Sequence, residues 1–295
     1  ADTAEALPPA EAAADIERTI TVRGRSLRVA ERRGVAGRTP LVLCNGIGSS
    51  MELFDPFLAE LDPERPVVRF DVPGVGASPR PVLPYRLPSL AFTLRAVLDR
   101  LGHHQVDILG ISWGGGLAQQ FAFQHPRRCR HLVLVATGTG SLMVPAGPAV
   151  LARMLTPRRH RDPDYALRIA GEIYGGSARS APAEAIEALH GIGHPTTRRG
   201  YVYQLLASAG WASLPFLPLI RTPTLLLAGS DDPIIPEINA TLMARLLPKA
   251  TLHRYAGGHL GLLTEAGDLA PVIENFLDTA PAPEPAAPRE NGAQR

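Results

Sequence analysis

The stretch that most constrains the fold is residues 106–116, which read V-D-I-L-G-I-S-W-G-G-G. Aliphatic and β-branched residues precede Gly110, as in a buried parallel strand, and residues 117–123 have the pattern of a helix. Ser112 therefore lies at a predicted strand-to-helix turn, with Gly110 and Gly114 two residues away on either side. Such a turn strains the backbone at the serine, leaves no room for side chains at the two glycines, and lifts the hydroxyl out of the sheet. The pattern predicts a nucleophilic serine, with helix N–H groups aimed at any anion that forms there.

G-x-S-x-G also occurs by chance in glycine-rich loops, so this interpretation depends on the rest of the chain. Short apolar segments recur and alternate with helical patterns. Besides the strand before Ser112, strands are predicted at residues 20–22, 27–30, 41–44, 67–70, 131–136, 224–228 and 251–255. Strands that alternate with helices predict an α/β fold, here a mostly parallel eight-stranded sheet with helices on both faces.

The strand rhythm is interrupted between residues 141 and 214. This segment has helical pieces broken by proline and glycine and no convincing buried strand, which predicts a helical cap (141–214) inserted into a core of residues 17–140 and 215–279. The ends, 1–16 and 280–295, are rich in Ala, Glu and Pro without apolar periodicity, so we expect two disordered tails.

Composition limits the class of protein. With 45% hydrophobic residues the 295-residue chain can bury a full core, and a formal net charge of +2, spread along the sequence, gives no nucleic-acid-binding footprint. The short basic run 158–161 is expected to be a solvated helix end or loop.

No apolar run approaches a membrane span and no secretory pattern is present, so we expect a cytoplasmic protein, although residues before Ala1 could have been removed. Cys44 and Cys129 are expected to be small buried hydrophobes.

Two further strand ends carry the groups that a nucleophilic serine needs. Asp232 lies in the turn after residues 224–228, and His259 lies in the turn after residues 251–255. The carboxyl ends of parallel strands meet at one edge of a sheet, which brings both residues towards Ser112. His259 is predicted to act as general base, and Asp232 to orient the imidazole and stabilise its cation.

A second aspartate could take the role assigned to Asp232. Asp231 is adjacent to Asp232 in the sequence G-S-D-D-P. The spacing G-x-x-D, ending at a proline, favours Asp232.

An oxyanion site is predicted from the loops beside the serine. The backbone N–H of Trp113, directly after the nucleophile, is one expected donor. The N–H of Ile47, in the loop after residues 41–44, is the other, because Gly46 and Gly48 let that backbone come close.

No metal or organic cofactor is expected. His190 and His194 are spaced like zinc ligands, but Gly191 and Gly193 weaken any helix between them and no glutamate base accompanies them. The G-V-G at 74–76 lacks the third glycine of a dinucleotide-binding fingerprint.

With the order Ser, Asp, His in place, the chain resembles the α/β-hydrolase superfamily over residues 20–278. Several stretches resemble the intracellular medium-chain-length poly(3-hydroxyalkanoate) depolymerases more closely. They are C-N-G-I-G (44–48), F-D-V-P-G-V-G (70–76), G-I-S-W-G-G (110–115), M-V-P (143–145), I-Y-G-G (173–176), G-W (210–211) and A-G-S-D-D-P (228–233).

The resemblance implies hydrolysis of ester bonds in a storage polyester of 3-hydroxy fatty acids, without metal or organic cofactor, and contact with a polyester granule surface. Asn45 stands where many superfamily members have histidine, as it does in the depolymerases, and is a candidate substrate contact. Tyr174 and Trp211 are further candidates, because cap aromatics could line an apolar slot for alkyl chains or simply pack the cap onto the core.

Two other functions stay open at this point. One is a different cofactor-free hydrolase of the same fold, which acts on small esters, lactones or C–C bonds. The other is a non-catalytic binding or granule-coat protein, which predicts a damaged triad, and none is visible in the sequence.

Overall fold

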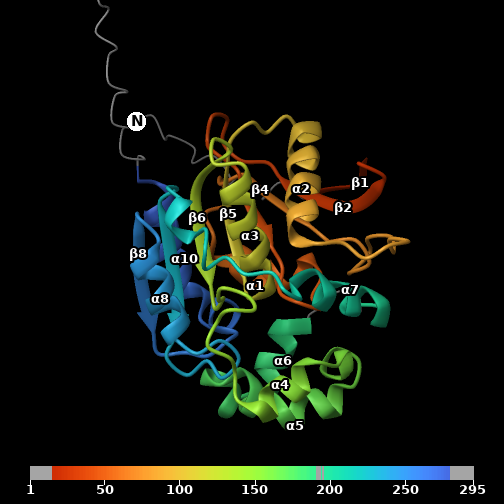
Figure 1. The fold of residues 1–295 in the computed structure, drawn as a ribbon, viewed down its shortest axis with the longest axis vertical. Helices are drawn as coiled ribbons and strands as arrows, with labels where there is room; N and C mark the ends of the chain where they lie inside the picture. Colours follow the sequence, from red (N-terminus) through yellow and green to blue (C-terminus); the bar gives the residue numbers. More distant parts are fainter. Residues whose placement is uncertain (1–14, 191–193, 195, 280–295) are drawn as a thin grey trace, which may run out of the picture.

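A computed structural model describes residues 15–190, 194 and 196–279 of the chain, and Figure 1 shows its ribbon. The described strands form an eight-stranded sheet in the order β1-β2-β4-β3-β5-β6-β7-β8. They are β1 (Ile16–Val22), β2 (Arg25–Arg32), β3 (Leu41–Cys44), β4 (Val67–Phe70), β5 (Val106–Ile111), β6 (Cys129–Val135), β7 (Thr224–Gly229) and β8 (Ala250–Tyr255). Strands β3 to β8 run parallel, and β2 is antiparallel to both β1 and β4. The predicted mostly parallel eight-stranded sheet is confirmed.

Helices cover the sheet on both faces, as predicted. The α-helices are α1 (Asp55–Glu60), α2 (Leu87–Leu101), α3 (Trp113–Gln124), α4 (Pro148–Met154), α5 (Pro163–Tyr174), α6 (Pro182–His190), α7 (Arg198–Ser208), α8 (Ile238–Leu246), α9 (Gly261–Thr264) and α10 (Ala266–Leu277). Short 3₁₀ helices are η1 (Met51–Phe54), η2 (Pro157–His160), η3 (Gly176–Arg179) and η4 (Leu217–Leu219). Among the described residues, none of these helices combines the length and apolar character needed to cross a bilayer.

The period of two along each strand divides the core between the two faces. On β3, Val42 and Cys44 join a buried cluster with side chains of α2, α3 and α8, whereas Leu41 and Leu43 join a second cluster with α1 and α10. Cys44 and Cys129 are both buried, as predicted. The sheet is therefore apolar on both faces, which explains why its inner strands are continuous hydrophobic runs.

The predicted strands lie where the sequence indicated, although several of their bounds differ by one to four residues, as does the start of one helix. Strand β1 begins at Ile16, inside the predicted tail 1–16, because it pairs with β2 along its whole length. Helix α3 begins at Trp113, four residues before the predicted start, because the serine turn leads directly into the helix. The rest of the predicted tails, residues 1–14 and 280–295, lies outside the described residues, so their disorder stays a prediction.

Helices α4 to α7 lie between β6 and β7 in the sequence, and we call residues 141–214 the cap. Figure 1 shows α4, α5 and α6 gathered below the sheet. The two ends of the cap meet in an antiparallel bridge between Gly140 and Ala212, next to a hydrogen bond of 2.8 Å from Ser141 N to Trp211 O. The chain thus leaves the core and returns to it at one point.

Candidate active site

Ser112 lies in a strained turn between β5 and α3. Its backbone has φ 54° and ψ −120°, a region that non-glycine residues rarely occupy. A Cβ atom on Gly114 would lie 2.1 Å from Cys44 O, and one on Gly110 would lie 2.4 Å from Gly114 O. Both positions therefore require glycine, because the backbones of the turn and of the β3 loop touch there. The turn is fixed by a 2.9 Å hydrogen bond from Ser112 N to Val135 O of β6.

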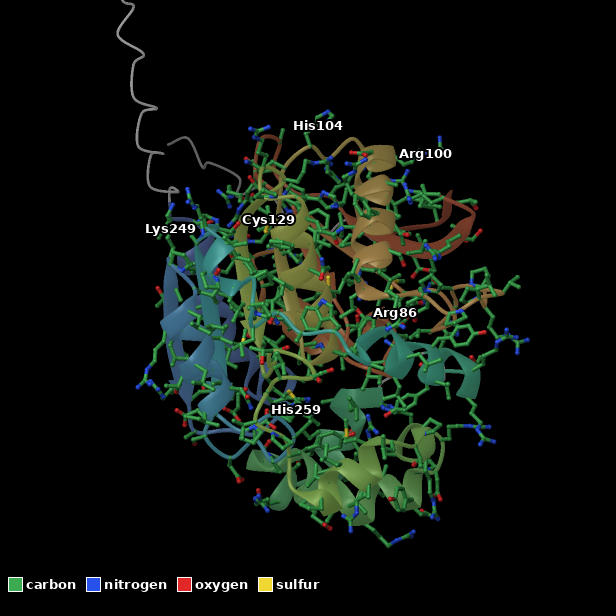
Figure 2. The ribbon with its side chains drawn as sticks, in the orientation of Figure 1. Arg86, Arg100, His104, Cys129, Lys249 and His259 are labelled. Atoms are coloured by element: carbon green, nitrogen blue, oxygen red, sulfur yellow. The ribbon has the colours of Figure 1, made fainter. Side chains whose placement is uncertain are left out.

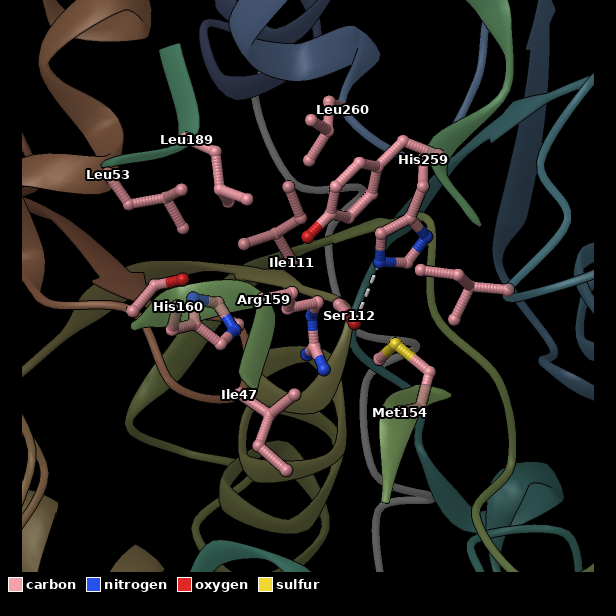
Figure 3. A pocket seen from close by; sticks show the side chains of 14 residues that line it. Ile47, Leu53, Ile111, Ser112, Met154, Arg159, His160, Leu189, His259 and Leu260 are labelled. Atoms are coloured by element: carbon pink, nitrogen blue, oxygen red, sulfur yellow. Dashed lines mark hydrogen bonds between the residues drawn. The ribbon is translucent and has the colours of Figure 1, made fainter. Parts of the chain in front are cut away.

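A chain of short contacts joins the serine to a histidine and an aspartate. His259 Nε2 is 3.0 Å from Ser112 Oγ, the contact drawn as a dashed line in Figure 3, and His259 Nδ1 is 2.8 Å from Asp232 Oδ2. The other oxygen of Asp232 accepts 2.9 Å hydrogen bonds from the N–H groups of Ile234 and Ile235. When Nδ1 carries the ring proton and donates a hydrogen bond to the carboxylate, Nε2 is free to accept the serine proton. The structure brings together the three residues that the sequence selected.

The cap helps to place the histidine. Figure 2 shows His259 where the sheet faces the cap, at the opposite end of the sheet from Cys129 and Lys249. The backbone N–H of His259 donates a 2.7 Å hydrogen bond to the backbone carbonyl of Tyr174, at the end of α5. A Cβ on Gly258 would lie 2.1 Å from the same carbonyl, so the histidine loop packs backbone against backbone on the cap.

The neighbouring aspartate has a different role. Asp231 forms an ion pair with Arg179 of the cap, with 2.6 Å between Nε and Oδ2, and accepts a 2.7 Å hydrogen bond from Gly176 N. The hydrogen bond from Arg179, and then that from Gly176, lower the pKa of Asp231 to about 2. Asp231 thus links the core to the cap, whereas Asp232 contacts His259.

The two predicted oxyanion donors lie on segments that flank the serine. The Trp113 N–H is the first of α3 and so has no acceptor within the helix. Ile47 lines the same cavity as Ser112, and a Cβ built on Gly46 would lie 3.8 Å from Ser112 Cβ. Both backbones therefore pass beside the serine.

Two cap residues that the sequence did not single out hold the Ile47 loop. Gln204 of α7 is fully buried, and its Oε1 accepts a 2.8 Å hydrogen bond from Gly48 N. Thr196 Oγ1 donates a 2.7 Å hydrogen bond to Gly48 O. The backbone carbonyl of Gln204 also accepts a 2.9 Å hydrogen bond from Trp113 Nε1, so one residue contacts both oxyanion segments. No sequence pattern marks these residues, since their partners are more than ninety positions away.

The serine and histidine open onto a small cavity with a volume of about 30 Å³. Its apolar lining is Ile47, Leu53, Ile111, Met154, Leu189, Ile234 and Leu260. A groove of about 690 Å³ on the cap side shares Ser49, Arg159, His160 and Leu189 with the cavity. The lining side chains converge on Ser112 in Figure 3. The Ser112 hydroxyl therefore lies beside a cavity lined mainly by apolar side chains.

Of the three predicted substrate contacts, the structure brings one to this cavity. Tyr174 lines it, and burial raises the pKa of its phenol. Asn45 is buried outside the lining and donates a 3.2 Å hydrogen bond to Ser49 O. Trp211 donates a 2.6 Å hydrogen bond to Gln120 Oε1 and packs on α3, so it fastens the end of the cap to the core.

The basic run 158–161 divides between solvent and interior. The side chain of Arg158 is 57% exposed, as predicted, but Arg159 is only 2% exposed and lines the cavity. The prediction of a solvated segment is wrong for Arg159, because the tight 3₁₀ turn η2 directs adjacent side chains to different sides. The sequence alone does not show which of several adjacent basic side chains will be buried.

The described residues include no group of three or more His, Cys, Asp or Glu side chains that could hold a metal ion. The side chain of His190 and residues 191–193 lie outside the described part of the chain. The expected lack of a metal site at His190 and His194 therefore stays a prediction.

Comparisons with known proteins agree with this geometry. A sequence model of the alpha/beta hydrolase fold matches residues 39–266. A poly(3-hydroxyalkanoate) depolymerase of Ectopseudomonas oleovorans is 47% identical over 262 residues, which span 89% of this chain and 92% of the relative. A 2-hydroxymuconate semialdehyde hydrolase of Pseudomonas putida is 32% identical over 74% of this chain and 79% of the relative. Among solved structures, a hydrolase from Pseudomonas aeruginosa PA01 superposes with a TM-score of 0.76 at 26% identity, covering 89% of this chain and 98% of its own. The chain therefore belongs to the α/β-hydrolase fold family and, within that family, resembles poly(3-hydroxyalkanoate) depolymerase.

Proposed function

We propose that this hydrolase is a serine esterase that cleaves the ester bonds of poly(3-hydroxyalkanoate) with medium-length side chains. The observation that carries the proposal is the contact chain from Ser112 Oγ through His259 to Asp232, with distances of 3.0 and 2.8 Å. The 47% identity to a poly(3-hydroxyalkanoate) depolymerase supports the polyester as substrate.

The proposed reaction proceeds through an acyl-enzyme. Ser112 Oγ attacks the ester carbonyl carbon while His259 Nε2 takes its proton, and the N–H groups of Trp113 and Ile47 donate to the oxyanion. The C–O bond to the alcohol unit then breaks, and His259 returns the proton to the departing oxygen. Asp232 stays ionised throughout and stabilises the imidazolium.

Water completes the cycle. It gives a proton to His259 as its oxygen attacks the acyl carbon, and the acid leaves as Ser112 regains its proton. Side chains, backbone N–H groups and water suffice for each step, so the proposal includes no metal or organic cofactor. Action in the cytoplasm, at the surface of a polyester granule, is part of the same proposal.

A second candidate is a cofactor-free hydrolase of small esters, lactones or C–C bonds. The 32% identity to 2-hydroxymuconate semialdehyde hydrolase favours it. Ser112 and His259 would serve either reaction, so the substrate is what separates the two.

The decisive experiment tests purified protein on suspensions of medium-chain-length and short-chain polyhydroxyalkanoate, beside p-nitrophenyl esters of graded length. Ser112→Ala is the matched control, and we expect it to lose about a millionfold in kcat, as when members of a serine triad act as a unit. Serine-dependent clearing of the medium-chain polymer supports the proposal. Cleavage of soluble esters without polymer clearing favours the second candidate, and an active Ser112→Ala protein contradicts the mechanism.

A further inference from the structure

Arg159 is a buried cation in the cavity that contains the reactive serine. Its side chain lines the cavity together with Ser112 and His259, and Figure 3 shows it among these residues. Its Nη1 donates a 2.9 Å hydrogen bond to Tyr201 OH and lies 3.4 Å from Thr156 O. Its buried Nε has no hydrogen-bond partner among the described residues. No described carboxylate lies within ion-pairing distance of this guanidinium.

The other buried arginines of the described chain are neutralised. Arg65 is fully buried and forms ion pairs with Glu274 and Asp278. Arg69 is paired with Asp15 and Asp55. The fold therefore compensates a buried guanidinium with carboxylates in both cases, and Arg159 departs from that pattern.

The groups around Arg159 do not supply the missing negative charge. The Tyr201 hydroxyl donates a 2.5 Å hydrogen bond to Met154 O and is not a carboxylate that could pair with the guanidinium. Burial raises the pKa of Tyr174, which keeps that phenol neutral. A guanidinium stays protonated in proteins, and burying an uncompensated charge is costly. An anionic ligand in the cavity would remove that cost.

We propose that Arg159 binds the terminal carboxylate of the substrate, so that the enzyme acts at the carboxyl end of ester-linked 3-hydroxy acid chains. This inference rests on the proposed function. In such a chain only two carbon atoms separate the scissile ester oxygen from the carboxyl group of the last unit. A carboxylate at that position lies close to Ser112, in the cavity that Arg159 lines. A guanidinium fork matches a carboxylate in shape and charge.

A chain end would reach Arg159 from the larger groove once the side chains that line the small inner cavity move apart. Arg159 borders the groove of about 690 Å³ as well as the inner cavity. The terminal unit would leave as a free 3-hydroxy acid, while the rest of the chain forms the acyl-enzyme and is released by water. Each cycle then shortens the chain by one unit and exposes a new carboxylate.

The test uses a dimeric ester of a medium-chain 3-hydroxy acid with a free carboxyl group, and the same dimer as its methyl ester. For the wild-type protein we expect kcat/KM to favour the free acid by about tenfold to a hundredfold, mostly through KM, because one charge-assisted contact is involved. Arg159→Gln should abolish this preference. Arg159→Lys, which keeps the charge without the fork, should retain part of it.

Arg158→Gln is the matched control. It removes the same charge one position away, from a residue that is exposed and paired with Asp162. It should keep the wild-type preference. If Arg159→Gln fails to fold, the comparison of the two dimers with the wild-type protein still tests the inference. A second test compares two inhibitors of the wild type, and the free 3-hydroxy acid should inhibit more strongly than its methyl ester.

Equal kcat/KM for the two dimers in the wild type would overturn the inference, and so would a preference that survives in Arg159→Gln. If both dimers are cleaved equally, the esterase proposal stands and only the role of Arg159 fails. If neither dimer nor any p-nitrophenyl ester is cleaved, the proposed function itself fails.

Discussion

At the scale of single residues, two adjacent carboxylates have separate surroundings. Asp232 is 7% exposed, contacts His259 and accepts two backbone N–H groups. Asp231 forms an ion pair with Arg179 in which both side chains are about half exposed. Two adjacent positions thus differ in their contacts: Asp232 contacts the histidine of the proposed triad, and Asp231 attaches the cap to the core.

We predict that Asp232→Asn lowers kcat by about ten-thousandfold, because an amide no longer selects the imidazole tautomer that accepts the serine proton. Asp231→Asn is the neighbouring control and should keep kcat near the wild-type value. Steady-state kinetics on a p-nitrophenyl ester measures both. The reverse ranking of the two variants would assign Asp231 as the acid.

At the scale of elements, helix α7 connects the cap to the loop that contains Ile47, a predicted oxyanion donor. Gln204 accepts from the Gly48 N–H through its side chain and from the Trp113 indole through its carbonyl. The loop that carries the Ile47 N–H is therefore positioned by a helix outside the core. A change in the position of α7 should therefore also move the predicted oxyanion donors.

We predict that Gln204→Met lowers kcat about tenfold or more while KM changes little, because the Ile47 N–H loses its alignment with the oxyanion and loss of one such donor costs up to about a thousandfold. Methionine keeps the volume and removes the acceptor. Leu206→Ala, at an exposed position of the same helix, is the control and should not change kcat. A rise in KM at constant kcat would indicate a purely structural role for Gln204.

The elements differ in how far the sequence reveals them. Strands β3 and β4 are short apolar runs with clear ends, and their predicted bounds match the structure. Ser112, Asp232 and His259 could be predicted because each follows a recognisable strand, and parallel strand ends meet at one edge. Arg159 and Gln204 could not, because they reach the site only through the folding of the cap, and local sequence does not specify how helices broken by proline and glycine pack together.

At the scale of the whole molecule, pH should affect stability through a carboxylate that is not part of the proposed triad. Asp71 is fully buried, and burial raises its pKa from 3.8 to about 6 although the N–H groups of Ala77 and Met51 donate to it. Between these two values the folded state binds the proton more tightly than the unfolded chain. The contribution of Asp71 to stability is therefore present below about pH 4 and is lost as the pH rises to about 6.

We predict that the free energy of unfolding of the wild type falls with pH across this range relative to that of Asp71→Asn, by up to about 3 kcal/mol in total. Urea unfolding of both proteins at several pH values between 4 and 7 measures the difference in slope. Only the slopes are compared, because the substitution also changes absolute stability. Parallel curves would show that Asp71 has an ordinary pKa in the folded protein.

The small cavity beside Ser112 limits which molecules can reach the serine. About 30 Å³ can admit a water molecule, but it cannot contain an acyl unit with an alkyl chain. In the proposed reaction, this cavity has room for the water of the second half-reaction but not for the acyl unit of the first. In the proposed reaction, entry of such a unit therefore requires the side chains that line the cavity to move apart. We therefore expect residues that line the entrance to affect substrate entry without taking part in the chemistry.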